Sequence, residues 1–486
     1  MQIVGSIGSG PMSVIVPTVV VLIGVGVALF GPWIVARIWI AGHGWTLALW
    51  SVIVAATLRS TSISSLQTPL WDVVLFCGLL CLGLISIFSS RKRVEMRDSR
   101  LIPIAVLLLI VGYALILNIA LNDWRYIARI GLFLFVLFAL VPSYLFRWRN
   151  SEVISQDLRS TFQVLTLLVA ISLTLGTIGD PEAFGYNDRL QGVWANPNYL
   201  GPICALTAIY GVSKLWFQSA QLARIFAWTT TLTGVAGVVW SGSRGSAAAA
   251  AVGIVVVSFP ALKHQGRAWK IVLGLTAIFA VGIAFSGYVR SFLSRSQVNT
   301  DFSSGRTELW GRLLDEATVF GAGLYTTTPD VSIEEVNASG GLIIQDLAPH
   351  NIFLQVLVEI GVIGLGIFVC FLLVVMRSRM KVPPYETLLG IVLAIFVYEL
   401  TESSLFGFGG PFALVAWLCI LMLASASRLT RTTQLEVEAS ANSPAISASI
   451  AMYSRRERQA AAASDLLPVG NQPVASTWEF GVARHD

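Results

Sequence analysis

The chain has 486 residues, of which 55% are hydrophobic and only 12% are charged, and its mean hydropathy is +0.74. A soluble domain is charged at about a quarter of its positions, so this composition excludes an ordinary soluble protein. The net charge of +5 does not indicate a nucleic-acid partner, because Lys- and Arg-rich cytoplasmic loops give membrane proteins the same balance. Many runs reach the roughly 20 apolar residues that cross a bilayer, so we predict an all-α, polytopic transmembrane helical bundle.

Apolar runs in the first part of the chain predict a series of membrane passes. The first run has no Lys or Arg before Arg37, whereas a cleaved signal peptide begins with a basic region, so we expect a retained helix. The basic cluster Arg91-Lys92-Arg93 marks a cytoplasmic loop and thereby orients the neighbouring passes. The predicted helices cover residues 14–34, 45–58, 72–88, 101–121, 126–146 and 160–178.

The remainder of the chain continues this pattern with one long interruption. Further apolar runs cover residues 199–216, 225–240, 247–262, 271–288, 352–376, 386–406 and 412–424, so we expect about 12 or 13 helices within residues 1–427. Residues 289–350 form one large hydrophilic loop, which the alternation of passes places on the extracytoplasmic face. The tail, residues 428–486, is rich in Ala, Ser and Arg and is expected to be cytoplasmic and mostly disordered.

Several arginines fall on the extracytoplasmic side, where topology gives no reason for them. Pairing with nearby carboxylates explains some of them, but a planar and permanently charged guanidinium also suits a diphosphate. These residues are Arg125, Arg189, Arg244, Arg290, Arg295, Arg306 and Arg312.

Within the large loop, residues 304–319 are predicted to form a surface helix that Ser303 or Ser304 caps. Arg306 precedes Leu309 and Trp310 by three and four residues, so it lies with them on the face toward the bundle. Arg312 lies on the opposite face, four residues from both Glu308 and Glu316, which favours a salt bridge. We therefore assign a functional role to Arg306. The apolar stripe of this helix comprises Leu309, Trp310, Leu313, Leu314 and Ala317.

Arg244 lies in the tight turn Ser241-Gly242-Ser243-Arg244-Gly245 between two apolar helices. The glycines allow backbone N–H groups to approach an anion, and the positive end of the next helix dipole begins there. A simple membrane-anchoring arginine is the alternative, and we favour anion binding.

His350 stands at the extracytoplasmic boundary, just before the helix at 352–376. A helix N-terminus disfavours added positive charge, so the imidazole should stay neutral and able to accept a proton, as a general base must. Asn351 can cap the helix. A plain capping or interfacial histidine is the alternative.

Three carboxylates, Glu359, Glu399 and Glu402, lie in or near the last membrane spans. Carboxylates in a membrane span are costly and usually have a partner, so these could pair with the arginines or orient His350, and the sequence does not decide which does so. No Asp-x-Asp pair, dense carboxylate set or histidine cluster occurs, so we expect neither a metal nor another cofactor.

These residues resemble the O-antigen ligase/polymerase superfamily of membrane glycan transferases over residues 187–406. The order of the motifs carries the resemblance more than any one of them. They are Asn196-Pro197-Asn198, Ser243-Arg244-Gly245, Ser304-Gly305-Arg306 with Trp310, Gly321 and Gly323, and His350-Asn351 followed by Glu359-Ile360-Gly361.

The resemblance implies a metal-independent, inverting transfer of a glycan from a polyprenyl (undecaprenyl) diphosphate donor to a hydroxyl of a glycan, lipid or protein acceptor. This reaction would take place at the outer face of the inner (plasma) membrane, in surface polysaccharide biosynthesis. Arg244 and Arg306 would hold the diphosphate, and His350 would take or orient the proton of the acceptor hydroxyl. The resemblance implies substrate-binding roles for Arg189, Asn196, Asn198, Trp310, Asn351 and Glu359.

Other functions stay open at this point. A chain polymerase of the same superfamily shares these motifs. A membrane transporter would place ionisable groups and broken helices near the midplane, and Glu359 suits it best, but the gathering of arginines at one face favours chemistry there. A structural scaffold gives no reason for Arg244, Arg306 and His350 to share a face.

Overall fold

The computed structural model describes most of the predicted bundle. The described residues are 44–61, 63–88, 101–120, 124–185, 189–217, 220–264, 306–315, 317–323, 332–336, 342–346, 350–376, 385–406 and 410–441. The helices predicted at 14–34 and 271–288, Arg290, Arg295 and most of the expected tail lie outside them. The chain divides into two units, residues 1–429 and residues 430–486.

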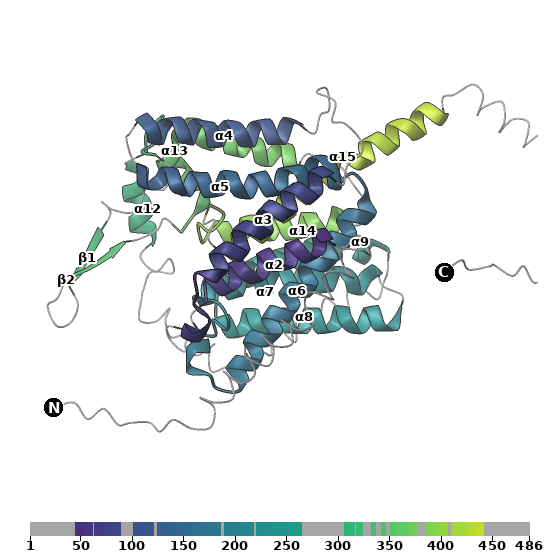
Figure 1. Ribbon diagram of the computed structural model, residues 1–486, viewed down its shortest axis with the longest axis horizontal. Coiled ribbons are helices and arrows are strands. Elements are labelled where there is room, and N and C mark those ends of the chain that lie inside the picture. The colour runs from purple at the N-terminus through teal and green to yellow at the C-terminus, as the bar shows by residue number, and fades with distance from the viewer. Residues whose placement is uncertain are drawn as a thin grey trace, which may run out of the picture. The chain divides into compact units, whose positions relative to one another are not determined.

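The first half of the described chain is helical (Figure 1). Its helices are α2 (Gly44–Arg59), α3 (Leu70–Phe88), α4 (Leu101–Ala120), α5 (Trp124–Pro142) and α6 (Ser151–Thr177). Short helical turns follow three of them: η1 (Ser64–Leu66), η2 (Ser143–Arg147) and η3 (Pro181–Ala183).

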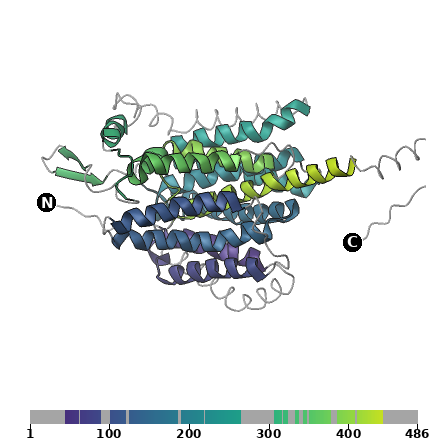
Figure 2. The ribbon, with the colours of Figure 1, turned by 90° about the horizontal axis from the view of Figure 1, so that it is seen from above.

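The second half adds α7 (Pro197–Phe217), α8 (Gln221–Ser241), α9 (Arg244–His264), α12 (Arg306–Asp315), α13 (Ile352–Met376), α14 (Tyr385–Glu399) and α15 (Pro411–Ala441). The two views show many of these helices side by side along a common direction (Figures 1 and 2). Among the described residues, five helices are long and apolar enough to cross a membrane, namely α3, α4, α6, α8 and α13. The predicted all-α polytopic bundle is therefore confirmed.

Three boundaries of the long helices differ most from the sequence prediction. Helix α6 begins at Ser151, before the predicted residue 160, because the side chain of Asn150 accepts the backbone N–H of Glu152 and caps it. Helix α14 ends at Glu399, before residue 406, because the Glu399 carboxylate accepts the N–H groups of Ser404 and Leu405 in a turn. Helix α15 continues to Ala441, so the first part of the tail that was expected to be mostly disordered, residues 428–441, is helical, as its many good helix formers permit.

The large loop also contains structure that the sequence did not predict. Strands β1 (Ser332–Val336) and β2 (Leu342–Asp346) pair antiparallel, with Ser332 opposite Asp346 and Val336 opposite Leu342. The predicted helix at 304–319 is shorter, since α12 ends at Asp315 and residues 317–323 run against α13.

Helix α7 forms the centre of the half of the bundle that carries the candidate site. It packs against α8 and α9, and α9 in turn packs against α14. Glycines permit these close approaches: a Cβ at Gly211 would lie 2.6 Å from the backbone nitrogen of Thr231, and one at Gly234 would lie 2.5 Å from that of Ala208. The helix ends that carry polar residues are thereby fixed relative to one another.

A buried ion pair ties α5 and α6 together through the intervening turn. The Arg147 guanidinium donates to both carboxylate oxygens of Asp157, each at 2.7 Å, and Trp148 Nε1 donates to the same carboxylate at 2.9 Å. Arg147 also lies 4.5 Å from the ring centre of Trp45 on α2, a cation–π contact. This cluster links three helices through polar groups whose charges are paired.

Candidate functional site

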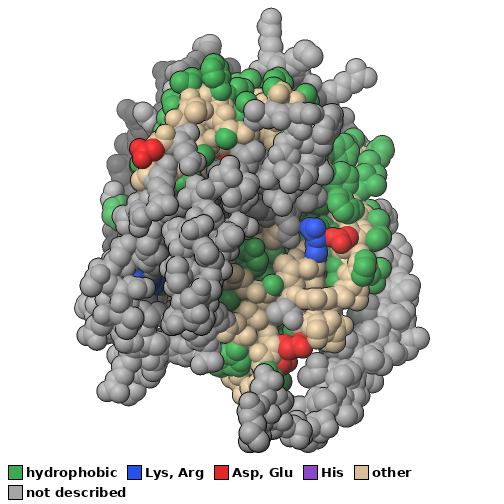
Figure 3. All heavy atoms as spheres, turned by 90° about the vertical axis from the view of Figure 1, so that its left-hand side faces the viewer, with side chains coloured by type: hydrophobic (Ala, Val, Ile, Leu, Met, Phe, Trp, Pro, Cys, Tyr) green, Lys and Arg blue, Asp and Glu red, His purple; other side chains and the backbone are tan. Residues whose placement is uncertain are grey.

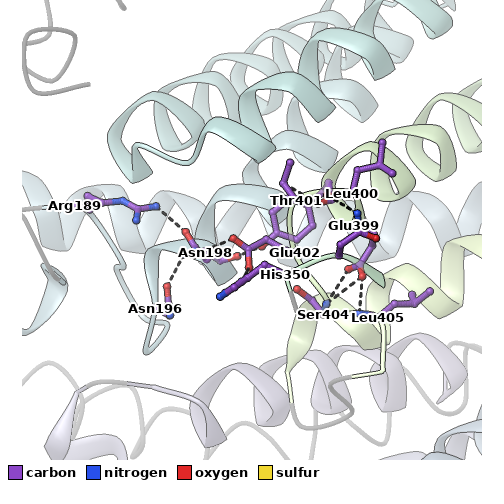
Figure 4. Close-up of polar contacts among 12 residues, drawn as sticks. Arg189, Asn196, Asn198, His350, Glu399, Leu400, Thr401, Glu402, Ser404 and Leu405 are labelled. Carbon is purple, nitrogen blue, oxygen red and sulfur yellow. Dashed lines mark hydrogen bonds and ion pairs between the residues drawn. The ribbon is translucent and has the colours of Figure 1, made fainter. Parts of the chain in front are cut away.

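One end of the bundle brings together polar residues from four separate parts of the chain (Figure 4). His350 immediately precedes α13, and Asn198 lies in the first turn of α7. Arg189 comes from the loop between α6 and α7, and Glu402 from the connection after α14. Because α7, α9 and α14 pack on one another, residues two hundred positions apart in the sequence meet here.

Glu402 is the centre of this network. Its Oε2 lies 2.7 Å from His350 Nδ1, and its Oε1 accepts a hydrogen bond from Asn198 Nδ2 at 3.2 Å. The Glu402 side chain is only 14% exposed and that of His350 is 30% exposed, so solvent screens the pair only in part.

The contact between Glu402 and His350 fixes the histidine tautomer. For an ionised Glu402 and a neutral His350 ring, Nδ1 carries the proton and donates it, because an ionised carboxylate is only an acceptor. The Nε2 atom of the neutral ring is then left with a lone pair, and this atom can accept a proton from another molecule. An imidazole held in this way has the arrangement of a general base with an orienting carboxylate.

The backbone of His350 is unusual and is held in place by its neighbour. Among the described residues other than glycine, only His350 has a positive φ, 48°, a conformation that costs about 1–3 kcal/mol. Asn351 Oδ1 accepts the N–H groups of Phe353 and Leu354 at 3.0 and 3.2 Å, which confirms the predicted cap. Asn351 Nδ2 also donates to the carbonyl of Leu400 at 3.2 Å, so α13 begins against the end of α14.

Asn198 connects this pair to Arg189. Arg189 Nη2 donates to Asn198 Oδ1 at 2.7 Å, while Tyr398 OH donates to the Asn198 carbonyl at 2.5 Å. Asn196 Oδ1 accepts the backbone N–H of Asn198 at 2.8 Å and so caps the first turn of α7. Both predicted asparagines therefore belong to the network, and their described contacts are with the protein itself.

Arg189 also reaches the turn between α8 and α9. Its Nε donates to the carbonyl of Ser241 at 2.7 Å. Gly242 follows with φ 61°, and a Cβ there would lie 3.4 Å from Arg189 Nε. The arginine thus lies close against this turn.

Arg244 is the first residue of α9 and is exposed. Ser243 caps this helix, because its Oγ accepts the N–H of Ser246 at 3.3 Å and the Ser246 hydroxyl at 2.8 Å. A Cβ at Gly245 would lie 2.1 Å from Thr401 Oγ1, so the start of α9 adjoins the residue before Glu402. Arg244 therefore extends from the same junction that Arg189 and Glu402 occupy.

The other two carboxylates have separate environments. Glu399 is buried and accepts backbone N–H groups. Glu359 is buried within α13 and accepts a hydrogen bond from Gln355 Nε2 at 3.0 Å. Of the three candidates it is Glu402 that contacts His350 Nδ1, at 2.7 Å, so we assign the orienting role to Glu402.

Helix α12 lies next to α13 and begins at Arg306, whose side chain is outside the described part of the structure, as is that of Arg312. Trp310 is half-buried and Leu313 is buried, as the predicted stripe requires. Leu314, however, is 53% exposed, so its place on the buried stripe was wrong. Successive residues of a helix point about 100° apart, so Leu313 and Leu314 face different directions. Of these two residues, Leu313 is the one that is buried.

Seen from the end where α12 and the hairpin lie, hydrophobic side chains gather at the top and on the right of the described surface (Figure 3). The few described charged side chains on this face lie apart from one another, except for one basic and one acidic side chain on the right that lie side by side. Within the described part of the chain, no group of three His, Cys, Asp or Glu residues could hold a metal ion.

The sequence left Glu402 as one of three candidate partners of His350 without choosing it, and it missed Tyr398 and Ser241 entirely as partners of Asn198 and Arg189. A carboxylate near the end of a membrane span was a signal for Glu402, but three such carboxylates were present. Tyr398 and the Ser241 carbonyl gave no local signal, because their roles arise from contacts across the bundle.

Comparison with known proteins adds a family. Residues 229–369 match the model of a family described as O-antigen ligase. This segment runs from within α8 to within α13 and contains Arg244, Arg306 and His350. No curated protein matches the chain.

The match agrees with the order of motifs and with the helical bundle, and it supports a membrane protein that processes glycans in the manner of the ligases and polymerases of this superfamily. The match over residues 229–369 therefore supports the resemblance to the O-antigen ligase/polymerase superfamily that the order of motifs predicted.

Proposed function

We propose that this protein is a metal-independent glycosyltransferase of the inner (plasma) membrane. It moves a glycan from a polyprenyl diphosphate donor to a hydroxyl of a glycan, lipid or protein acceptor, at the extracytoplasmic face. The observation that carries the proposal is the hydrogen-bonded pair of His350 and Glu402 at the end of a membrane bundle, joined through Asn198 to Arg189.

His350 acts on the acceptor. Its Nδ1–H is directed to Glu402, so Nε2 takes the proton from the acceptor hydroxyl as the oxygen attacks the anomeric carbon. The bond between that carbon and the diphosphate oxygen breaks, and the electron pair leaves with the polyprenyl diphosphate. Glu402 stabilises the imidazolium that forms, and attack from the face opposite the leaving group inverts the anomeric configuration.

The arginines act on the donor. Arg244 and Arg306 hold the diphosphate, and a guanidinium offers two parallel N–H donors to phosphate oxygens. Charge that develops on the leaving diphosphate is thereby stabilised without a metal. Arg189, which borders Gly242 and Ser241, contacts the donor phosphate or sugar beside Arg244.

A chain polymerase of the same superfamily would use the same groups and differ only in its acceptor, a second lipid-linked glycan. A transporter is the candidate from another class. The observation that favours it is Glu359, which is buried one turn beyond Gln355 in a helix broken at Gly361, since transporters use broken helices with ionisable groups. The His350–Glu402 pair has no role in that reading.

The proposal is tested with purified protein in detergent, a polyprenyl diphosphate oligosaccharide and a panel of hydroxyl acceptors. Acceptor-dependent release of polyprenyl diphosphate that a chelator leaves unchanged is the expected result, and a ladder of product sizes would identify a polymerase. A loss of activity in chelator that a divalent cation restores would contradict the metal-free mechanism. No release with any pair of substrates, together with solute flux in liposomes, would favour the transporter.

A further inference from the structure

Helix α13 is broken at Gly361, and another segment of the chain crosses the break. Gly361 has φ 72° and ψ −177°, a backbone conformation that is essentially restricted to glycine. Residues 317–323 run past this point, and we call them, together with residues 358–363, the clasp. Backbone hydrogen bonds join its two sides: Ala322 N to Val358 O (2.9 Å), Gly323 N to Glu359 O (2.8 Å), Val362 N to Thr318 O (3.2 Å) and Ile363 N to Val319 O (3.3 Å).

Two glycines meet at the centre of the clasp. A Cβ at Gly361 would lie 2.3 Å from the carbonyl oxygen of Val319, and a Cβ at Gly321 would lie 2.4 Å from that of Glu359. Gly321 also has a positive φ of 86°. These obstacles are backbone atoms, which cannot rotate away as a side chain can, so any larger residue must separate the two segments.

The clasp also contacts a third helix. The hydroxyl of Tyr113 on α4 donates to the carbonyl of Phe320 at 2.8 Å. Residues 317–323 therefore contact both α13 and α4.

The clasp also satisfies backbone polar groups at the break. Irregular backbone within a membrane bundle persists only where its polar groups are paired. The clasp provides that pairing for the peptide groups that the break at Gly361 leaves without helical partners.

The clasp also joins the two segments that carry the proposed chemistry. Helix α12 begins at Arg306 and ends at Asp315, just before residues 317–323. Helix α13 begins just after His350. The clasp is therefore a direct noncovalent connection between the helix that Arg306 begins and the helix that His350 precedes.

We propose that the Gly321–Gly361 clasp is a positioning device that sets α12, and with it Arg306, relative to His350 for glycan transfer. This inference rests on the proposed function and adds the glycines and Tyr113 as positioning residues. If the clasp served only to stabilise the fold, breaking it would lower the transfer rate equally with or without Arg306. If the clasp positions Arg306, breaking it lowers the transfer rate mainly when Arg306 is present.

The test is a cycle of variants in the transfer assay, with rates normalised to folded protein. Gly361→Ala should lower the rate about a hundredfold, since a displacement of about 1 Å has that effect on a reaction. In an Arg306→Lys background, Gly361→Ala should lower the transfer rate by less than about threefold, because the effects of two substitutions that act through one contact do not add. Gly366→Ala is the matched control, since a Cβ there meets nothing within 4 Å.

Equal losses in both backgrounds would show general destabilisation and overturn the proposal, as would a wild-type rate for Gly361→Ala. If Gly361→Ala does not fold, Tyr113→Phe replaces it in the same cycle. That change removes one hydroxyl bond and should cost about threefold to tenfold in rate, again only when Arg306 is present.

A distance measurement separates this inference from the proposed function. Spin labels at Gly311→Cys on α12 and Gly112→Cys on α4, two positions where a Cβ meets nothing within 4 Å, are placed in a cysteine-free background. Gly361→Ala should shift or broaden the distance between them. An unchanged distance overturns the clasp, even if the wild-type protein transfers glycan. A changed distance with no transfer by any wild-type preparation supports the clasp's structural role and overturns the proposed function.

Discussion

Replacing Glu402 by glutamine tests the role of the His350–Glu402 pair most sharply. The carboxylate accepts hydrogen bonds from His350 Nδ1 at 2.7 Å and from Asn198 Nδ2 at 3.2 Å. Glutamine keeps the size of the side chain but replaces one of the two acceptor oxygens by an NH₂ group. Because His350 and Asn198 contact different oxygens, one of these donors then faces the NH₂ group, and the imidazolium loses its counter-charge.

The expected loss follows from the energy of a charged hydrogen bond. Such a bond contributes about 1.5–3 kcal/mol, and about 1.4 kcal/mol corresponds to a factor of ten in rate. Glu402→Gln should therefore lower the transfer rate at saturating donor by roughly tenfold to a hundredfold. Donor affinity should change little, because the proposed mechanism assigns the diphosphate to Arg244 and Arg306 and not to Glu402.

The assay is release of polyprenyl diphosphate under single-turnover conditions, with donor binding measured separately. Glu182→Gln is the matched control: this glutamate is exposed and accepts hydrogen bonds from the N–H and hydroxyl of Ser64. It should retain the wild-type rate. A folded Glu402→Gln variant with the wild-type transfer rate would refute the assignment of Glu402 as the residue that orients His350.

Two further predictions concern charged groups elsewhere in the bundle. Arg306→Lys should lower transfer by more than about tenfold, because a point charge cannot replace the planar pair of donors that a guanidinium offers a diphosphate; product formation at the wild-type rate would exclude Arg306 from the donor site. Asp157→Asn should destabilise the fold by about 3–5 kcal/mol, since it leaves the Arg147 guanidinium buried without its counter-charge. Thermal unfolding in detergent measures this loss, and an unfolding midpoint equal to that of the exposed control Glu182→Gln would contradict it.

The sequence predicted the helices well because apolar runs of membrane length leave few alternatives. Helices α3, α4 and α13 begin and end within a few residues of the predicted runs. Boundaries were missed where polar contacts decide them, as at the start of α6, which Asn150 caps, and at the end of α14, which the Glu399 turn terminates. Such contacts are not visible in hydropathy.

The candidate site was predicted in part. Four of the predicted residues lie together in the structure, namely His350, Arg189, Asn198 and Asn351. They could be predicted because each is a polar residue near the end of an apolar run. Glu402 could be chosen over Glu359 only once the packing of α7 against α14 was known. The clasp at Gly361 was equally out of reach, since a glycine within an apolar helix does not reveal which distant segment will pair with its backbone.

The most direct test of the central claim compares His350→Ala with the wild-type protein, using a labelled polyprenyl diphosphate glycan and one acceptor. His264→Ala, at the opposite end of α9 from Arg244, is the control. The proposed role predicts that His350→Ala binds donor with nearly wild-type affinity and transfers it about a hundredfold to ten-thousandfold more slowly, the usual contribution of a general base. Transfer by folded His350→Ala at the wild-type rate would contradict the proposed mechanism.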